Sequence, residues 1–435
     1  MRVSAEDIEE HYEVLHKIGN LGATLTEGFL RAAYSSEESE AMRYIESAAS
    51  SFGCESSWDP VGNLSIELPG ESSQFVEFAS HIDTVPCGGN FDGAAGVVAG
   101  LAALKAIAQQ KERKLGVRLR IWRGEEGSTF NVVSIGSRAA FGELPVESLK
   151  NSFDGRSLRS AMESQDVELS FIEEGRSTID EEELDGIAAH FELHIEQGKV
   201  LESSNVDIGV VTEIRGTFRE WVFFSGAFDH SGATPLGAEH RKDVNLALAH
   251  FLVRFDQLSK KQGEHDLVQT VGVINSNRSF NDSMPALYQN AVPKVSGFLY
   301  FSLEVRSSEN EFRNSYVDEV HKLLDETVDE FGVSVKREPI VSKDGVGELS
   351  SQLIQLSNAS CRELGVSSLE LPSGAWHDAA LLAQKQRSNG EPIPVGMIFI
   401  PCKEGVSHNP KEFSSDEQLA KGASVLVENW RRLNE

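Results

Sequence analysis

The spacing of apolar residues predicts alternating helices and strands along the first third of the chain. Helical periodicity covers residues 5–19 and 38–52, and a run of small apolar residues predicts a further helix over about 93–110. Three short apolar runs predict strands, at residues 64–68, 75–79 and 117–122. This alternation is typical of an α/β domain with a mostly parallel sheet flanked by helices, and such sheets bind ligands beyond the carboxyl ends of their strands.

The pattern changes in the middle of the chain. Residues 145–185 are polar and acidic, and we expect helices and loops there before a strand at 191–195. From about residue 209 the elements follow the order strand–helix–strand–strand–helix–strand, which is typical of a compact α+β domain inserted into a larger one. The expected elements of this region are strands at 210–214, 220–224, 268–274, 298–305 and 333–336 and helices at 243–259 and 309–330.

The α/β pattern returns near the C-terminus and sets the expected domain boundaries. Helices are expected near 349–363 and 377–384, and a strand at 396–400. We therefore predict one domain formed by residues 1–211 and 342–435, and an inserted domain of residues 212–341. A chain of 435 residues exceeds one ordinary hydrophobic core, so its length also favours two domains.

Composition limits the partners and the compartment. The formal net charge is −28, from 68 acidic and 40 basic residues, and such a surface repels nucleic acid and anionic lipid, so we expect neither as a partner. The most apolar window, 94–108, is too short to cross a membrane, and the charged N-terminus lacks the apolar core of a secretion signal. Four scattered cysteines without C-x-x-C spacing are typical of reduced thiols. We expect a cytoplasmic protein.

The strand at 75–79 leads into candidate metal ligands. His81 and Asp83 follow it directly, and Asp92 comes after a Gly-Gly turn. Imidazole and carboxylate together suit zinc and its neighbours. In His-x-Asp the carboxylate can bind the ring nitrogen that does not face the metal, which fixes the tautomer. The alternative is that Asp92 only forms a turn, as most Asp-Gly pairs do.

A second candidate site follows the strand at 117–122. Glu125 and Glu126 stand between Gly124 and Gly127, and adjacent residues of a regular strand point in opposite directions. Both acids serve one site only if the glycines bend the chain. One carboxylate would then bind metal while the other polarises a metal-bound water. The alternative is a solvated glutamate pair in a very acidic chain.

Three histidines and an arginine complete the candidates. His194 shares one face of its strand with Glu192 and Glu196, and His408 lies in a loop just after the strand at 396–400. His230 belongs to the inserted domain, and Arg306, at the end of a strand there, could clamp a carboxylate. Taken singly, a loop histidine or a surface arginine is more often only exposed.

Several segments together resemble one family. They are similar to the N-carbamoyl-L-amino-acid hydrolase group of amidohydrolases, which includes allantoate amidohydrolase and β-ureidopropionase and is related to two-metal aminoacylases and carboxypeptidases. The resemblance extends over nearly the whole chain, in the family's order. The segments are SHIDTVPCGGNFDGAAGV, RGEEGSTF with IGSRA, ELHIEQGKVLE, DHSGATP, NAVP, SGAWHDA and MIFIPCKEGVSHNP.

The resemblance implies a role for each candidate. His81, Asp92 and His194 resemble the ligands of one metal, and Asp92, Glu126 and His408 those of a second, with Asp92 bridging and Asp83 behind His81. Glu125 resembles the general base, and His230 a residue that reaches over from a partner subunit to stabilise the oxyanion. The positions that resemble substrate-binding residues are Gln197, Asn290, Arg306, Gly374 and His377. Two departures concern the substrate pocket: Trp376 stands where glycine is usual, and the segment between Gly272 and Asn290 is longer and more polar than expected.

The implied activity is hydrolysis of a linear ureido C–N bond in a small substrate that carries a carboxylate. N-carbamoyl-L-amino acids, cleaved to amino acid, carbon dioxide and ammonia, are the first expectation, with allantoate and ureidopropionate as alternatives. An aminoacylase or dipeptidase, or a non-catalytic binding protein on the same scaffold, also stays open. The resemblance further implies a homodimer with two divalent metal ions per subunit, zinc first and manganese or cobalt as alternatives. The larger domain would hold the metals, and the inserted domain would act as lid and dimerisation domain.

Overall fold

The fold comes from a computed structural model that describes the chain except for residues 1, 23–26, 277–292 and 347–348. The chain divides into two compact units, one of Met1–Glu213 with Glu348–Glu435 and one of Ile214–Gly347. The insert expected from the sequence, residues 212–341, ends before the smaller unit of the structure does. The reason is that strand β12 (Ser334–Lys343) of the smaller unit continues beyond residue 341.

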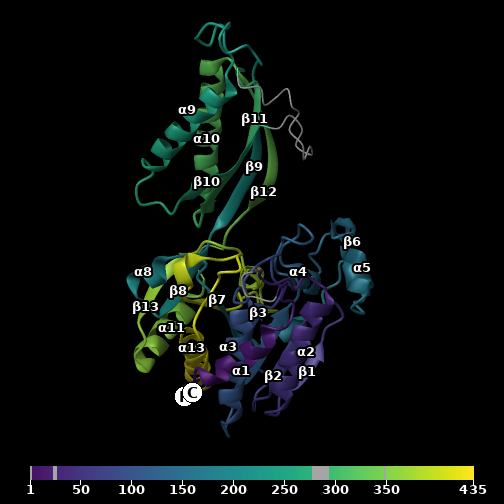
Figure 1. Ribbon diagram of the computed structural model, residues 1–435. Coiled ribbons are helices and arrows are strands. Elements are labelled where there is room, and N and C mark those ends of the chain that lie inside the picture. Colours follow the sequence, from purple (N-terminus) through teal and green to yellow (C-terminus); the bar gives the residue numbers. More distant parts are fainter. Residues whose placement is uncertain (1, 23–26, 277–292, 347–348) are drawn as a thin grey trace. The chain divides into compact units, whose positions relative to one another are not determined.

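The larger unit contains an eight-stranded mixed sheet (Figure 1). In spatial order its strands are β1 (Glu55–Trp58), β2 (Leu64–Leu68), β4 (Gly116–Trp122), β3 (Phe75–His81), β7 (Ile187–Ile195), β14 (Val395–Ile400), β8 (Ile208–Ile214) and β13 (Ser368–Ser373). The four central strands, β4, β3, β7 and β14, are mutually parallel. The expected mostly parallel sheet is thus parallel only at its centre, since β2 pairs with β4, and β8 with β14, in antiparallel fashion.

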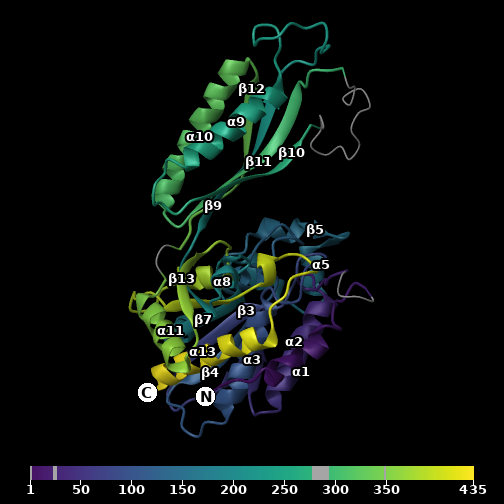
Figure 2. The same cartoon turned by 60° about the vertical axis from the view of Figure 1, so that its left-hand side comes forward.

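Burial on both faces explains why the central strands are apolar runs rather than alternating ones. Every residue of β14 is buried, and so are all but one of β3 and of β7. Helix α3 (Ala94–Ala108) packs on β3, β4 and β7, and α13 (Asp416–Asn434) packs against α3 (Figure 2). The other helices of eight residues or more in the described part of this unit are α1 (Glu6–Leu15), α2 (Ser36–Ser50) and α11 (Ser351–Leu364).

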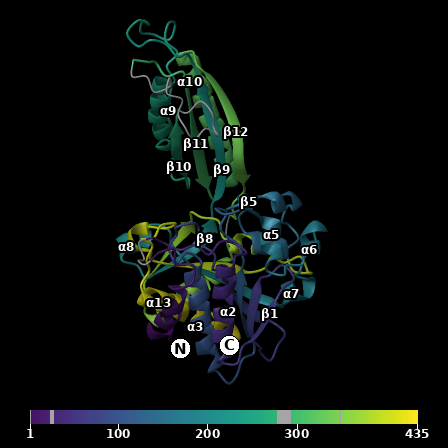
Figure 3. The same ribbon diagram turned by 45° about the vertical axis from the view of Figure 1, so that its right-hand side comes forward.

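The acidic stretch 145–185 forms the short helices expected from its sequence. They gather on one side of the larger unit, together with the small hairpin of β5 (Ser152–Phe153) and β6 (Arg156–Ser157) (Figure 3). A core that includes Trp122, Phe130 and Leu158 joins this segment to the end of β4. The short helices of the larger unit are α4 (Ile135–Ala140), η1 (Val146–Lys150), α5 (Leu158–Glu163), α6 (Leu169–Glu173), α7 (Glu181–Gly186), α8 (Val200–Ser204), α12 (Asp378–Leu382) and η3 (Lys403–Gly405).

The smaller unit has the order β9–α9–β10–β11–α10–β12 around an antiparallel four-stranded sheet. Its elements are β9 (Gly216–Ser225), α9 (Val244–Ser259), β10 (Val268–Asn275), β11 (Phe298–Ser307), α10 (Asn310–Phe331) and β12, in the sheet order β10-β11-β9-β12. Its core includes Phe224, Phe251 and Phe301. The strand expected at 210–214, which the sequence grouped with this unit, is instead part of β8 in the larger sheet, where it pairs with β14.

Two further observations bear on the environment. Within the described residues, no helix is both long enough and apolar enough to cross a membrane. All four cysteines, Cys54, Cys87, Cys361 and Cys402, are free thiols.

Candidate active site

The candidate residues of the larger unit meet at one edge of its sheet. His81 ends β3, Glu125 and Glu126 follow β4, and His194 lies at the end of β7. The loop that carries His408 follows β14. Because these four strands are parallel neighbours, their carboxyl ends lie side by side, and the topology brings together side chains more than 300 positions apart.

His81, Asp92 and His194 form the first group of possible metal ligands. The Nε2 atom of His194 lies 3.0 Å from Oδ1 of Asp92, and that of His81 lies 3.7 Å from the same oxygen. The two Nε2 atoms are 3.5 Å apart. All three residues are buried, and the other ring nitrogen of His194 bonds the carbonyl of Ile195 at 3.0 Å, which fixes the ring.

Asp92, Glu126 and His408 form the second group. The Nε2 atom of His408 lies 3.2 Å from Oδ2 of Asp92 and 3.1 Å from Oε1 of Glu126. Asp92 therefore turns one oxygen to each group. These two acidic partners raise the pKa of His408 to about 11 in the metal-free protein.

Asp83 joins the two loops that carry the ligands. Its carboxylate accepts the backbone N–H groups of Glu125 and Glu126 at 3.0 and 3.1 Å. One of its oxygens also lies 3.2 Å from Nδ1 of His81. This is close enough for an ion pair, but the two atoms are not aligned for a hydrogen bond. Gly124, with φ of +60°, makes the bend that lets both glutamates serve one site.

Glu125 is buried beside the first group of candidate ligands. Its Oε2 is 3.9 Å from Nε2 of His81, and the residue is 8% exposed. Burial raises the pKa of Glu125 well above its usual range; His81 opposes this, and the negative charges of Asp378 and Glu126 add to it. A carboxylate with a raised pKa next to possible metal ligands suits proton transfer.

The donors fit a pair of divalent cations by their chemistry and by the space around them. In each group, one ligand atom from every residue lies within 4.8 Å of the others. Gly93 has φ of +64°, and a Cβ there would lie 2.3 Å from Nε2 of His81. Only glycine at this position leaves room for the imidazole ring of His81. Three imidazoles and two carboxylates match zinc, manganese or cobalt better than calcium or magnesium.

A third group, Glu192, His194 and His377, satisfies the same distance limit, but its donors are already engaged. Glu192 accepts the N–H of Ala379 at 2.9 Å, and Nε2 of His377 lies 2.9 Å from the hydroxyl of Ser373. Nε2 of His194 already faces Asp92.

Residues 78–432 match Peptidase family M20/M25/M40. The chain belongs to this family. It is therefore a hydrolytic enzyme, and the dinuclear metal dependence general in the M20 family agrees with the two ligand groups. The resemblance inferred from the sequence is confirmed.

Two relatives of this M20 chain are named as amidohydrolases. N-carbamoyl-L-amino-acid amidohydrolase of Pseudomonas sp. (strain NS671) is 30% identical over 433 residues, covering 98% of each chain. Allantoate amidohydrolase of Bacillus subtilis is 31% identical over 423 residues, covering 94% of each. The crystal structure of a hydantoinase/carbamoylase family amidase from Burkholderia multivorans has a TM-score of 0.83 at 25% identity, covering 100% of this chain and 98% of that one.

The residues expected to bind substrate are distributed over both units of the M20 chain. In the larger unit, Gln197 donates to Oδ2 of Asp92 at 2.7 Å, and the ring of His377 lies 4.5 Å from that of His194; Gly374 is exposed nearby in sequence. In the smaller unit, Arg306 pairs with Glu304, and His230 is exposed. Asn290 lies outside the described residues.

One expectation about His194 is wrong. Glu196, expected beside it on the strand face, lies beyond the end of β7 and accepts the N–H groups of Val200 and Leu201 at the start of α8. Glu192, the other expected neighbour, does lie beside His194, with ligand atoms of the two residues within 4.8 Å. Asp92, from another loop, lies closer still, 3.0 Å from Nε2 of His194.

Apart from Asp83, sequence reasoning missed the residues that support the candidate ligands. Ser407 donates to Oδ2 of Asp92 at 2.8 Å, and Glu412 accepts the N–H of Asp92 at 2.8 Å. Buried Asp378 accepts from Ser137, and burial, with Glu192 nearby, raises its pKa to about 7. Serines and acids are common in this chain, so only the short separation of Ser407 and Glu412 from His408 could have pointed to them.

Proposed function

We propose that this enzyme is a two-metal amidohydrolase that cleaves a linear ureido C–N bond, with N-carbamoyl-L-amino acids as the first substrate class. The observation that carries the proposal is the sharing of Asp92 between two ligand groups, with Glu125 beside them. The amidohydrolase relatives support the bond type. Allantoate and ureidopropionate are the alternative substrates.

Five side chains would hold the two cations: His81, Asp92 and His194 for one, and Asp92, Glu126 and His408 for the other. Bound divalent metals, zinc first with manganese or cobalt as alternatives, would supply Lewis acidity and lower the pKa of a coordinated water. Asp83 orients His81 and both glutamate backbones, so the ligands are held in place before substrate arrives.

Glu125 would act as the proton carrier. Its position next to His81 and its low exposure support a base that takes a proton from the attacking water and delivers it to the leaving nitrogen. Gln197 and His377 border the same ligands and would orient the ureido group. This division assigns metal binding to Glu126 and proton transfer to Glu125.

The smaller unit would act as lid and dimerisation domain. Arg306 would bind the carboxylate of the substrate, and His230 would reach the oxyanion from a partner subunit, as the family resemblance implies. Strand β10 stands at one end of the four-strand order, and Val268, Val273 and Ile274 on it are 45%, 45% and 55% exposed. An apolar edge strand favours pairing with a second copy.

Four free thiols support a reducing compartment such as the cytoplasm.

The test is an ammonia-release screen across N-carbamoyl-L-amino acids, allantoate and ureidopropionate, with zinc, manganese and cobalt varied. N-acetyl amino acids and dipeptides, assayed by amine release, distinguish an aminoacylase or dipeptidase. The variant Glu125→Gln keeps the shape of the side chain but removes the base, so we expect turnover to fall by about 100-fold or more with metal content unchanged. Full activity in this variant would refute the assignment, and a protein that takes up no divalent metal would favour a binding function.

A further inference from the structure

One buried carboxylate connects two of the loops that carry candidate metal ligands, those of Asp92 and His408. The Oε1 atom of Glu412 accepts the backbone N–H groups of Phe91 and Asp92, each at 2.8 Å. Its Oε2 accepts the N–H of His408 at 3.2 Å. Glu412 is 4% exposed, and it joins backbone segments 320 positions apart.

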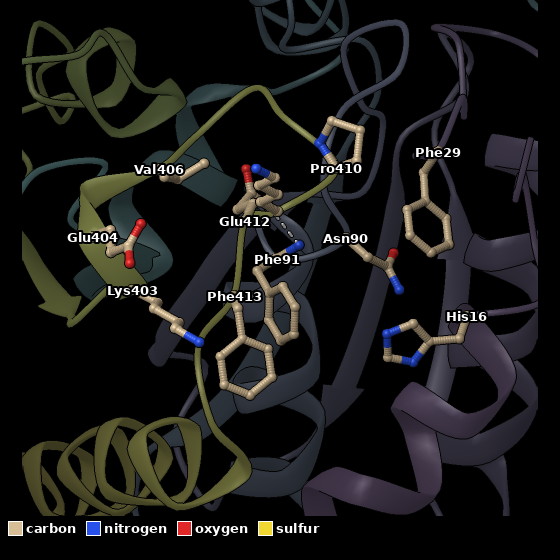
Figure 4. Close-up of a pocket in the computed structure, with 11 residues that line it drawn as sticks. His16, Phe29, Asn90, Phe91, Lys403, Glu404, Val406, Pro410, Glu412 and Phe413 are labelled. Atoms are coloured by element: carbon tan, nitrogen blue, oxygen red, sulfur yellow. Dashed lines mark hydrogen bonds between the residues drawn. The ribbon is translucent and has the colours of Figure 1, made fainter. Parts of the chain in front are cut away.

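The packing around Glu412 leaves it little freedom. A Cβ on Gly89 would lie 2.4 Å from both Cβ and Oε1 of Glu412, so the glycine allows the carboxylate to press against the loop. On the other side, Phe91 stacks on Tyr12 with ring centroids 4.9 Å apart and meets Phe413 edge-on at 5.5 Å. Figure 4 shows Glu412 with its bond to Phe91 in the wall of a cavity of about 610 Å³.

Glu412 bonds the backbone of two candidate ligands, Asp92 and His408. The side chain of His408 is 50% exposed, and its backbone has φ of +55°, in the left-handed region that residues with a Cβ seldom adopt. Asp92 must present different oxygens to the two ligand groups, which fixes the orientation of its carboxylate. A small backbone displacement at either residue would separate the groups.

We propose that Glu412 is the positioning residue that sets the backbone of Asp92 and His408 for binding of the second metal. The inference rests on the two-metal function proposed above. Glu412 contacts neither group of ligand atoms through its own oxygens; it acts through three backbone N–H groups. The carboxylate is required because all three partners are donors, and an amide would turn its NH₂ group toward one of them.

The experiment compares the full-length wild type with Glu412→Gln and Glu412→Ala. Zinc affinity is measured by competition with a chelator, cobalt binding by its visible absorption spectrum, and folding by the melting temperature. The matched control is Asp59→Asn, since Asp59 also accepts two backbone N–H groups, from Val61 and Asn63, but contacts no ligand. We expect the affinity for the second zinc ion to fall about 10–100-fold in both Glu412 variants, as for other residues that orient ligands.

The cobalt spectrum of Glu412→Gln should also change, while Asp59→Asn keeps the wild-type affinity and spectrum. If Glu412→Ala does not fold, Glu412→Gln decides the matter, because it retains the packing volume. Wild-type affinity and spectrum in Glu412→Gln would overturn the positioning role. A wild-type protein that binds only one metal, or none, would overturn the two-metal function itself, and the two failures are thereby distinguished.

Discussion

Gly93 provides the sharpest test of the ligand geometry, because a side chain added there would meet the ring of His81 directly. In Gly93→Ala the new methyl group would lie 2.3 Å from Nε2 of His81. The ring must retreat by about 1 Å to reach ordinary contact, and a misplacement of that size can cost about 100-fold in turnover. His81 is buried and lies against Asp83, so it has no free space to yield into.

The same substitution has a backbone cost that must be separated from the clash. Gly93 has φ of +64° and ψ of −49°, outside the left-handed helical region, so alanine there costs more than the about 1–2 kcal/mol of that region. Gly365 offers a partial control: its φ of +69° and ψ of +29° lie in the left-handed helical region, and a Cβ there would meet nothing within 4 Å. Gly365→Ala should therefore lose about 1–2 kcal/mol of stability without losing activity.

The assay measures metal content, turnover on the best substrate of the screen, and the free energy of unfolding of the metal-free proteins. We expect Gly93→Ala to lose zinc and at least about 100-fold of its activity, and Gly365→Ala to lose neither. Full activity and full metal content in Gly93→Ala would refute the placement of His81 as a ligand. An equal loss of activity in Gly365→Ala would show that backbone strain, and not the clash, is responsible.

Two further predictions concern stability and substrate binding. Burial alone would raise the pKa of Glu77, but Arg120 and His190 hold this pKa well below its usual range. The ionised Glu77 therefore stabilises the folded protein fully above about pH 4.5, and this stabilisation is lost as the pH falls further. Glu77→Gln should lower the free energy of unfolding, measured in urea, by about 3 kcal/mol at pH 7. It should also weaken the fall of this free energy at acid pH, and an unchanged acid dependence would contradict the prediction. Arg306→Ala should raise KM for carboxylate substrates by about 10-fold or more with little change in kcat, because it removes a charge-assisted bond. Arg219→Ala, which removes the other arginine paired with Glu304, is its control, and equal KM values in the two variants would exclude the clamp.

The central strands could be predicted because burial on both faces imposes an uninterrupted apolar run. Strands β3, β4 and β14 were found in this way, at or within a few residues of their bounds. The direction of pairing was not predictable for β2 and β8, since an apolar run has the same composition whether its neighbour runs parallel or antiparallel. The mixed character of the sheet therefore emerged only from the structure.

By itself, the sequence determined which side chains are candidates for the chemistry. His81, Asp92 and Glu126 stand in local motifs whose residue types are those that bind divalent metal. The family resemblance implied the two ligand groups, but only the tertiary structure decided their distances, that Asp92 turns one oxygen to each group, and that Glu412 ties the loop of Asp92 to that of His408. These relations join loops hundreds of residues apart, and they depend on the order in which the central strands lie side by side, which no local pattern contains.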